Sequence, residues 1–115
     1  MPRKKLTPPE RLAKFRGKRH FKAWDTFVDD KRVKRSETSI EKLIDDLILL
    51  GDEPDEAKAR KAVARCVKRF NRLDELDEFG WIFTIERDDI SVVIDELVEA
   101  CGFEPDEDWL EGRDW

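Results

Sequence analysis

Apolar residues recur with the spacing of an α-helix along most of this chain. Between residues 40 and 48 they stand at positions i, i+3, i+4, i+7 and i+8, which places them on one helical face. Similar stripes run through residues 59–73 and 90–101, and charged residues, 44% of the chain, fill most other positions. The pattern predicts an all-α fold, a compact bundle of three to four helices with charged outer faces.

Capping residues predict where the first core helices begin and end. One helix is expected to end in the basic stretch 31–35, and a capping box at residues 38–41 predicts the start of the next. Gly51 is placed to stop this second helix. The first of the two contains four large apolar residues that share one face, namely Phe21, Trp24, Phe27 and Val28.

The second half of the chain predicts two further helices. The longer covers residues 59–73, and the last begins near Thr84, as its N-cap, and stops at Gly102. The apolar run 81–85 between them has no partner strand, so we expect an extended or turn segment packed on the helices.

The first 20 residues differ in composition from the rest. They are basic and contain prolines, and residues 7–10 form a capping box that favours a short helix over residues 8–16. Only Leu6, Leu12 and Phe15 offer apolar anchors. We therefore expect residues 1–20 to be a basic extension, dispensable for folding, and residues 21–115 to be a single helical domain.

The acidic segment 103–115 carries large apolar residues that water would solvate poorly. We expect it to fold back as a packed aromatic tail that clasps the helices, with Trp115 as its anchor. Arg113 is surrounded in sequence by acids, which predicts a carboxylate partner. The candidate clasp or interaction residues are Arg87, Trp109, Arg113, Asp114 and Trp115.

The net charge of −5 conceals blocks of opposite sign. Residues 57–73 hold seven basic and no acidic residues, whereas residues 74–115 hold two basic and 16 acidic ones. Such blocks favour packing of a basic helix beside acidic elements, although each exposed pair contributes only about 0–1 kcal/mol.

Several classes of protein are disfavoured by the sequence. The longest aliphatic run, residues 47–50, is far shorter than the roughly 20 residues that span a bilayer, and no signal peptide is recognisable. Cys66 and Cys101 lie on apolar stripes, as small buried hydrophobic residues do. We expect a cytoplasmic protein with no membrane partner and no cofactor.

The C-terminal third contains a distinctive group of residues. They are Ile82-Phe83-Thr84, Arg87, Ile90, Ile94, Ala100-Cys101-Gly102-Phe103, Asp106, Asp108, Leu110 and the terminal Arg113-Asp114-Trp115. This arrangement resembles a family of small bacterial domains of unknown function that end in Arg-Asp-Trp. The resemblance is clearest after Ile82 and does not include the basic extension. It implies a bacterial, cytoplasmic, helical domain and no particular chemistry.

The sequence contains no pattern typical of a catalytic, cofactor-binding or metal-binding site. The densest carboxylate cluster, residues 86–96, could serve a metal-dependent enzyme, but acids are also favoured at helix starts and on solvated faces. His20 stands among cations with no carboxylate near it in sequence, which predicts a surface histidine. Cys66 lies between Val63 and Phe70 on the apolar stripe, so we expect an inert thiol rather than a nucleophile.

Three functions therefore stay open. The first is an accessory module that binds another protein, suggested by the tryptophan-rich tail and the segregated charges. The second is a nucleic-acid-associated factor that contacts phosphates through the basic arm, although the rest of the chain is acidic. The third is the metal-dependent enzyme at Glu86–Glu96. The residues proposed for nucleic-acid contact are Arg3, Lys4, Lys5, Arg16, Lys18 and Arg19.

Overall fold

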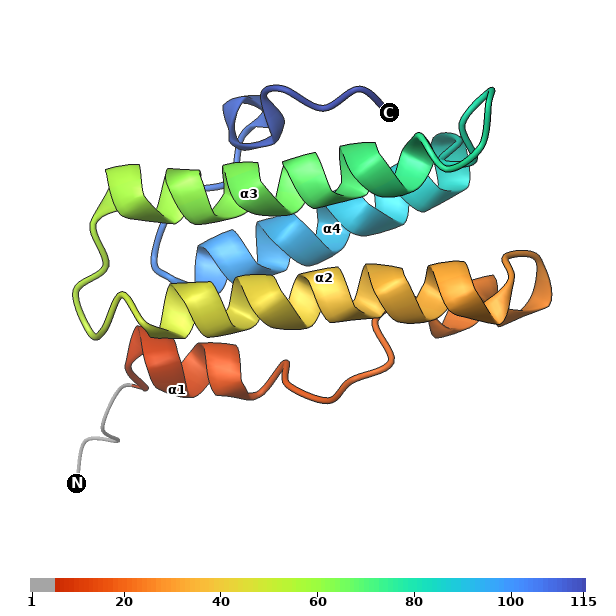
Figure 1. Ribbon diagram of the computed structural model, residues 1–115. Helices are drawn as coiled ribbons and strands as arrows, with labels where there is room; N and C mark the ends of the chain where they lie inside the picture. Colours follow the sequence, from red (N-terminus) through yellow and green to blue (C-terminus); the bar gives the residue numbers. More distant parts are fainter. Residues whose placement is uncertain (1–5) are drawn as a thin grey trace.

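The computed structural model describes residues 6–115 as an all-helical bundle, which confirms the predicted fold class (Figure 1). No strand occurs in this range, and no helix in it is long and apolar enough to cross a bilayer. The elements in chain order are α1 (Pro8–Ala13), the 3-10 helix η1 (Lys22–Thr26), α2 (Asp30–Ile48), α3 (Glu56–Asp74), α4 (Thr84–Ala100) and the 3-10 helix η2 (Glu107–Leu110).

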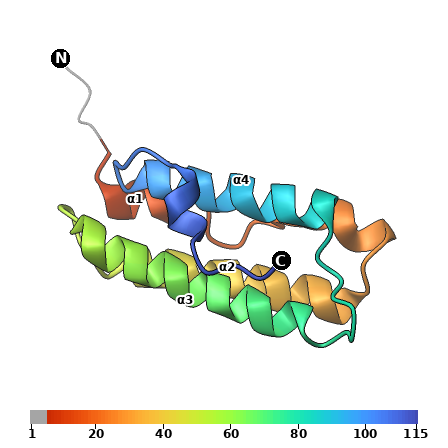
Figure 2. The ribbon, with the colours of Figure 1, turned by 90° about the horizontal axis from the view of Figure 1, so that it is seen from above.

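Three long helices form the body, and shorter elements cover it. α2 and α3 form an antiparallel pair, and α4 lies behind them in Figure 1. α1 packs on both α2 and α4, and η2 packs on α3. Seen from above in Figure 2, the C-terminal tail crosses the space between α3 and α4.

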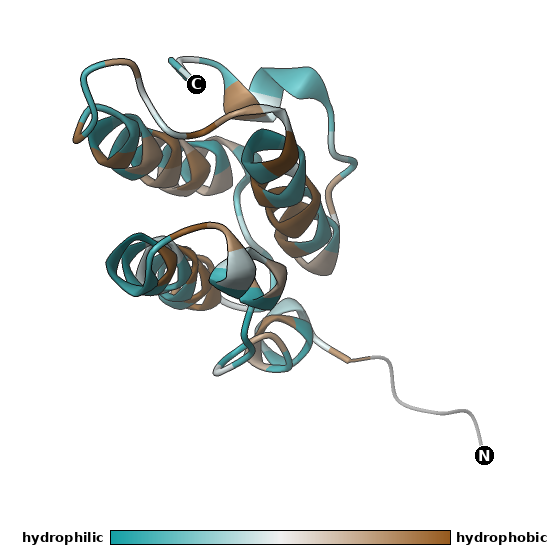
Figure 3. Cartoon of the chain, turned by 90° about the vertical axis from the view of Figure 1, so that its right-hand side faces the viewer, coloured by the Kyte–Doolittle hydropathy of each residue, from teal (hydrophilic) through white to brown (hydrophobic). Residues whose placement is uncertain are grey.

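The core is built from the inward faces of the three long helices. Figure 3 shows their hydrophobic residues turned toward one another and their hydrophilic residues turned outward. The stripes predicted over residues 40–48, 59–73 and 90–101 face this core and are buried, except that Ile48, Leu73 and Val93 are only partly buried. Both cysteines are free and buried within this core, and burial raises the pKa of Cys66 to about 12 and that of Cys101 to about 11.

The predicted first core helix is wrong. Phe21 and Trp24 are buried, but they belong to η1 and its flank, and α2 begins only at Asp30. The Asp29 side chain accepts a hydrogen bond from the backbone N–H of Arg32 (2.9 Å), and this cap starts the helix. α2 then runs without a break through the expected capping box at residues 38–41.

The short helix predicted in the extension is present and docked. Thr7 and Glu10 form the expected capping box at the start of α1. Leu12 is fully buried in the common core, and Arg11 Nε donates to the carbonyl of Ala100 (2.8 Å) at the end of α4. The extension therefore supplies part of the core, which argues against its expected dispensability.

The helices of the second half lie close to their predicted positions. α3 covers the predicted range, and Trp81 and Ile82 form a buried non-helical turn, as expected, whereas residues 84 and 85 of the run 81–85 belong to α4. The N-cap of α4 is Phe83 and not the predicted Thr84, so the helix starts one residue earlier than predicted. The helix ends beside Gly102, whose φ of 94° is a left-handed conformation that suits glycine.

Candidate functional site

A pocket of about 310 Å³ opens at the end of the bundle where α2 and α4 begin. Three segments form its walls: the turn after η1, the first turn of α2 and the connection into α4. Figure 3 views the molecule from this end. The lining residues are Phe27, Val28, Asp29, Arg32, Trp81, Phe83 and Glu86.

Hydrogen bonds fix the conformation of the connection between α3 and α4. Asp74 Oδ1 accepts hydrogen bonds from the backbone N–H groups of Trp81 (2.8 Å) and Ile82 (2.9 Å). Gly80 has a φ of 75°, and a Cβ at this position would lie 2.8 Å from Asp74 Oδ1. The indole Nε1 of Trp81 donates to the carbonyl of Leu73 (2.6 Å). These bonds anchor Trp81 to the end of α3 and set the direction in which α4 starts.

Arg32 is a wall of the pocket whose charge is already balanced. Its guanidinium pairs with Asp29 (2.7 Å) and with Asp77, and it lies over the Trp81 ring at 5.7 Å from the centroid. The two carboxylates outnumber the one cation. Arg32 therefore has no charge left to neutralise a further acid in the pocket.

Glu86 is the unusual residue of this site. It is only 7% exposed, yet its side chain has no hydrogen bond or ion pair with any residue of the described range 6–115. The Glu86 carboxylate oxygens are not completely buried, and they are accessible to solvent in the pocket. The carboxylate therefore faces the pocket without a fixed partner in the described range and is free to accept a hydrogen bond from a ligand there.

Exposed apolar side chains surround the opening. Phe27 is 53% exposed, Phe83 64% and Ile85 61%. Phe27 was predicted on the inner face of a helix, and its exposure corrects that prediction, since η1 ends before it and turns it outward. Aromatic faces attract cations, and the surrounding apolar surface favours an apolar chain. The pocket is thus suited to a positively charged group on an apolar stem.

Sequence reasoning did not identify this pocket. Glu86 was counted among the acids that suit a helix start, and Trp81 and Phe83 only as packing residues. The only sequence feature that could have indicated the pocket is a glutamate three residues after an aromatic residue, in a segment that also contains a tryptophan. This feature indicates a pocket only when Arg32 and Asp29, at the start of α2, lie next to it in the fold, and no local pattern predicts that contact.

The predicted clasp residues are only partly brought together. Trp109 and Trp115 are buried: the Arg60 guanidinium lies 4.2 Å from the Trp109 centroid, and the Trp115 ring meets Phe70 edge-on at 6.0 Å. Arg113 is exposed and lies over the Trp115 ring at 5.7 Å, and no carboxylate of residues 6–115 pairs with it.

One residue that sequence reasoning missed joins the tail to the body. Asn71 on α3 donates from Nδ2 to the carbonyl of Gly112 (3.0 Å) and accepts at Oδ1 from the backbone N–H of Asp114 (2.9 Å). The only sequence feature that could have indicated this role of Asn71 is that it is a single amide among the basic residues of α3. Arg87, by contrast, is half-buried on α4, and its side chain has no bond to the tail in the part of the chain that the structure describes.

Cations of the basic arm form contacts within the protein. Arg3, Lys4 and Lys5 lie outside the described residues. Arg16 pairs with Asp45 (2.7 Å), and Lys18 lies over the Phe15 ring at 5.1 Å. These contacts occupy cations that the nucleic-acid hypothesis needs free.

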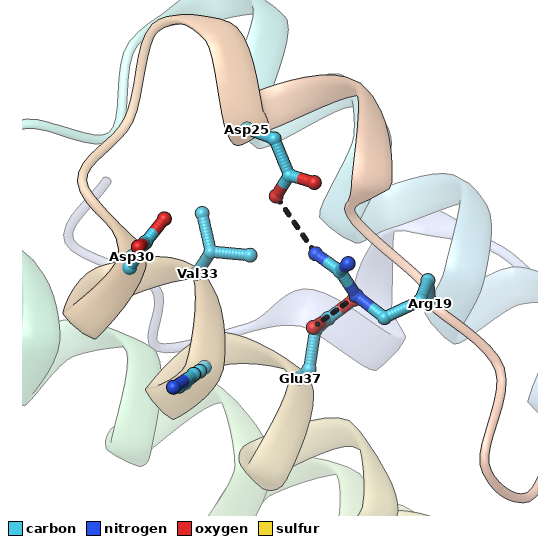
Figure 4. Close-up of a pocket in the computed structure, with 6 residues that line it drawn as sticks. Arg19, Asp25, Asp30, Val33 and Glu37 are labelled. Carbon is cyan, nitrogen blue, oxygen red and sulfur yellow. Dashed lines mark hydrogen bonds and ion pairs between the residues drawn. The ribbon is translucent and has the colours of Figure 1, made fainter.

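Arg19 also forms ion pairs within the protein, at a surface pocket of about 430 Å³. Its guanidinium pairs with Asp25 (2.7 Å) and Glu37 (2.9 Å), and these contacts raise its pKa further (Figure 4). The neighbouring His20 is not the predicted surface histidine. Its side chain is 3% exposed, and its Nε2 lies 2.7 Å from Glu41 Oε2.

The carboxylates between residues 86 and 96 do not form a cluster. Within residues 6–115, no three groups from histidine, cysteine, aspartate and glutamate come together as a metal site would require. Asp89 instead accepts a hydrogen bond from the Trp24 indole (2.8 Å). Burial raises the pKa of Asp95, to which the charges of Glu99 and Asp106 add. The site that the metal-dependent enzyme needs is therefore not assembled among these residues.

Comparisons with protein-family models, curated proteins and solved structures find no match to this chain. The likeness to bacterial domains ending in Arg-Asp-Trp therefore rests on the residues of its C-terminal third alone.

Proposed function

We propose that the protein is an accessory module that binds another protein, and that this partner inserts a lysine or arginine side chain into the pocket beside Glu86. The observation that carries the proposal is Glu86, a largely buried residue whose carboxylate faces the pocket and has no hydrogen-bond or ion-pair partner within residues 6–115. We also propose a cytoplasmic setting, which two free, buried cysteines suit.

Charge and shape support a cationic anchor. An ammonium or guanidinium group would give Glu86 the charged hydrogen bond that it lacks, and such bonds contribute about 1.5–3 kcal/mol. The apolar stem of the same side chain could pack on Phe27 and Phe83. Apolar residues next to the cation in the partner would cover the exposed rim that includes Ile85.

A peptide selection tests this proposal. The full chain is immobilised and used to enrich peptides from a random display library, and enriched sequences are synthesised and titrated against it. We expect the binders to share a lysine or arginine flanked by apolar residues. Replacement of that cation by norleucine should weaken binding about tenfold or more, because one charged hydrogen bond is lost.

Two variants of α4 provide the matched comparison. Glu86→Gln removes the charge of the pocket at nearly constant shape, and Glu96→Gln removes a charge from an exposed position on the same helix. We expect only Glu86→Gln to weaken the selected peptides. Enriched peptides without a basic residue, or equal affinity for Glu86→Gln and the parent, would contradict the proposal.

A further inference from the structure

A second pocket, of about 260 Å³, lies in the groove between α2 and α3 and is lined by cations. α2 contributes residues at positions 35, 38, 39 and 42, which the helical repeat places on one face. α3 contributes residues 69, 72 and 73, and the two helices lie side by side in Figure 1. The lining residues are Arg35, Thr38, Ser39, Lys42, Arg69, Arg72 and Leu73.

The cations of this groove have no counter-charge. No carboxylate lines it, and within residues 6–115 no ion pair involves Arg35, Arg69 or Arg72. Five other arginines of the described range have carboxylate partners, namely Arg16, Arg19, Arg32, Arg60 and Arg65. Arg11, Arg87 and Arg113 form no such pair in that range, but none of them lines this groove. The groove therefore differs from the rest of the surface in gathering unpaired cations at one place.

Arg69 is held at the base of the groove. Its Nη2 donates to the carbonyl of Ser39 (2.9 Å), while its Nε is sealed from solvent without a partner. Of the five N–H donors of a guanidinium, one is thus bound to Ser39, and the group also interacts with the buried Cys66 thiol. Arg69 is half-buried, and the exposed residues Arg72 and Lys42 line the same groove.

We propose that this groove binds a small molecule that carries two or more phosphate groups. Guanidinium groups match phosphate oxygens in pairs, lysine adds a point charge, and the Thr38 hydroxyl can donate to the same oxygens. Residues 35 and 42 are about 10 Å apart along α2, which is room for more than one phosphate group.

A small ligand fits the groove better than a nucleic acid. The net charge of the chain is −5, and residues 74–115 carry 16 acids, so a long polyanion meets repulsion beyond the groove. A short polyphosphate can reach the four cations without extending onto the acidic surfaces. The groove is lined by residues different from those of the Glu86 pocket, so the two proposals stand or fall separately.

Titrations of the full chain at constant ionic strength test the assignment. Inorganic diphosphate, orthophosphate, duplex DNA and single-stranded RNA are each added to ¹⁵N-labelled protein while amide shifts are followed. We expect saturable shifts confined to residues 35–42 and 69–73, with diphosphate binding about tenfold more tightly than orthophosphate. Diphosphate should also raise the melting temperature as its concentration rises.

Charge variants separate a defined site from general attraction. Lys42→Gln and Arg72→Gln remove exposed cations of the groove, and Lys58→Gln removes an exposed cation of α3 outside it. We expect each groove variant to weaken diphosphate binding about fivefold to tenfold and Lys58→Gln to change it less than twofold. Equal losses in all three variants, or no saturable shift, would overturn the proposal. Tighter binding of RNA or DNA than of diphosphate would overturn it in favour of a nucleic-acid surface.

Discussion

The two segments that flank the three long helices are attached to them by different means. The N-terminal segment is anchored by one fully buried leucine, Leu12, and by polar contacts from Arg11 and His20. The C-terminal tail is attached by two buried indole rings, Trp109 and Trp115. One segment is basic and the other acidic, and both cover the same core.

This comparison shows that the number of apolar residues is a poor guide to docking. The N-terminal segment has few of them, but Leu12 reaches the centre of the bundle and Glu41 of α2 receives both the backbone N–H of Gly17 (3.0 Å) and the His20 ring. The tail has more apolar surface, and the hydrogen bonds that join its backbone at Gly112 and Asp114 to the body come from one amide, that of Asn71. Depth of burial and the satisfaction of backbone groups decide which segment belongs to the fold.

Removal of residues 1–20 should have the largest effect. The composition of the segment predicts a small change in stability, whereas the burial of Leu12 predicts a large one. Emptying a fully buried leucine site costs about 2–5 kcal/mol, and loss of the contacts of Arg11 and His20 adds to this. We expect the melting temperature to fall by at least about 15 °C. A truncated chain that melts within a few degrees of the parent would restore the view that the extension is dispensable.

The two thiols report where the truncated protein has opened. α1 packs on the end of α4 beside Cys101, whereas Cys66 lies in the core near α2. The native pKa values of about 11 and 12, above the ordinary 9.0, keep both thiols protonated and slow to alkylate near pH 8. We expect truncation to speed alkylation of Cys101 at least about tenfold in the folded protein and to leave Cys66 slow. Equal acceleration of both would indicate global unfolding.

Trp115→Ala should have the next largest effect. A buried tryptophan replaced by alanine typically costs about 3–5 kcal/mol, and the unpartnered Nε1 of Trp115 places this one near 3 kcal/mol. The expected fall in melting temperature is about 10–20 °C, measured by circular dichroism. Glu111→Ala, an exposed change on the same tail, should alter it by less than about 3 °C. A Trp115→Ala protein as stable as the parent would mean that the tail does not clasp the body.

Asn71→Ala should have a smaller effect that depends on the tail. Two hydrogen bonds to Gly112 and Asp114 are lost, at about 0.5–1.5 kcal/mol each, so we expect a loss of about 1–3 kcal/mol. In a background that carries Trp115→Ala the tail is already released, and Asn71→Ala should then cost almost nothing. Additive losses in the double variant would show that Asn71 stabilises α3 itself and not the tail.

Much of the fold could be predicted from periodicity, because three apolar stripes have to be buried together. The error lay in α2, where Thr38 and Ser39 resemble a helix start but occupy the middle of the helix, and Asp29 provides the actual cap. A capping sequence is a local preference, and continued burial of Val33, Ile40 and Leu43 on one face outweighs it.

The candidate sites were far less predictable than the fold. Both pockets are lined by residues from separate segments of the chain, so neither has a contiguous motif. The basic groove was hidden by the misplaced helix boundary, since Arg35 and Lys42 were assigned to different helices although they share one face of α2. Glu86 was indistinguishable in sequence from the acids that follow it on α4, and only its burial sets it apart.

Arg113→Gln should have the smallest effect and tests how the tail ends. The sequence predicts a carboxylate partner for Arg113, whereas the structure places its exposed guanidinium over the Trp115 ring, 5.7 Å from the centroid. A contact between an exposed cation and an aromatic ring contributes about 0.5–1 kcal/mol. Salt would weaken an ion pair by screening its charges, but it would leave the packing of the Arg113 side chain on the ring in place. We expect Arg113→Gln to cost less than about 1 kcal/mol in urea unfolding, by nearly the same amount at low and high salt. A larger loss that disappears at high salt would show that Arg113 finds an acidic partner in solution. The tail would then resemble the N-terminal segment, whose arginines Arg16 and Arg19 already hold such partners.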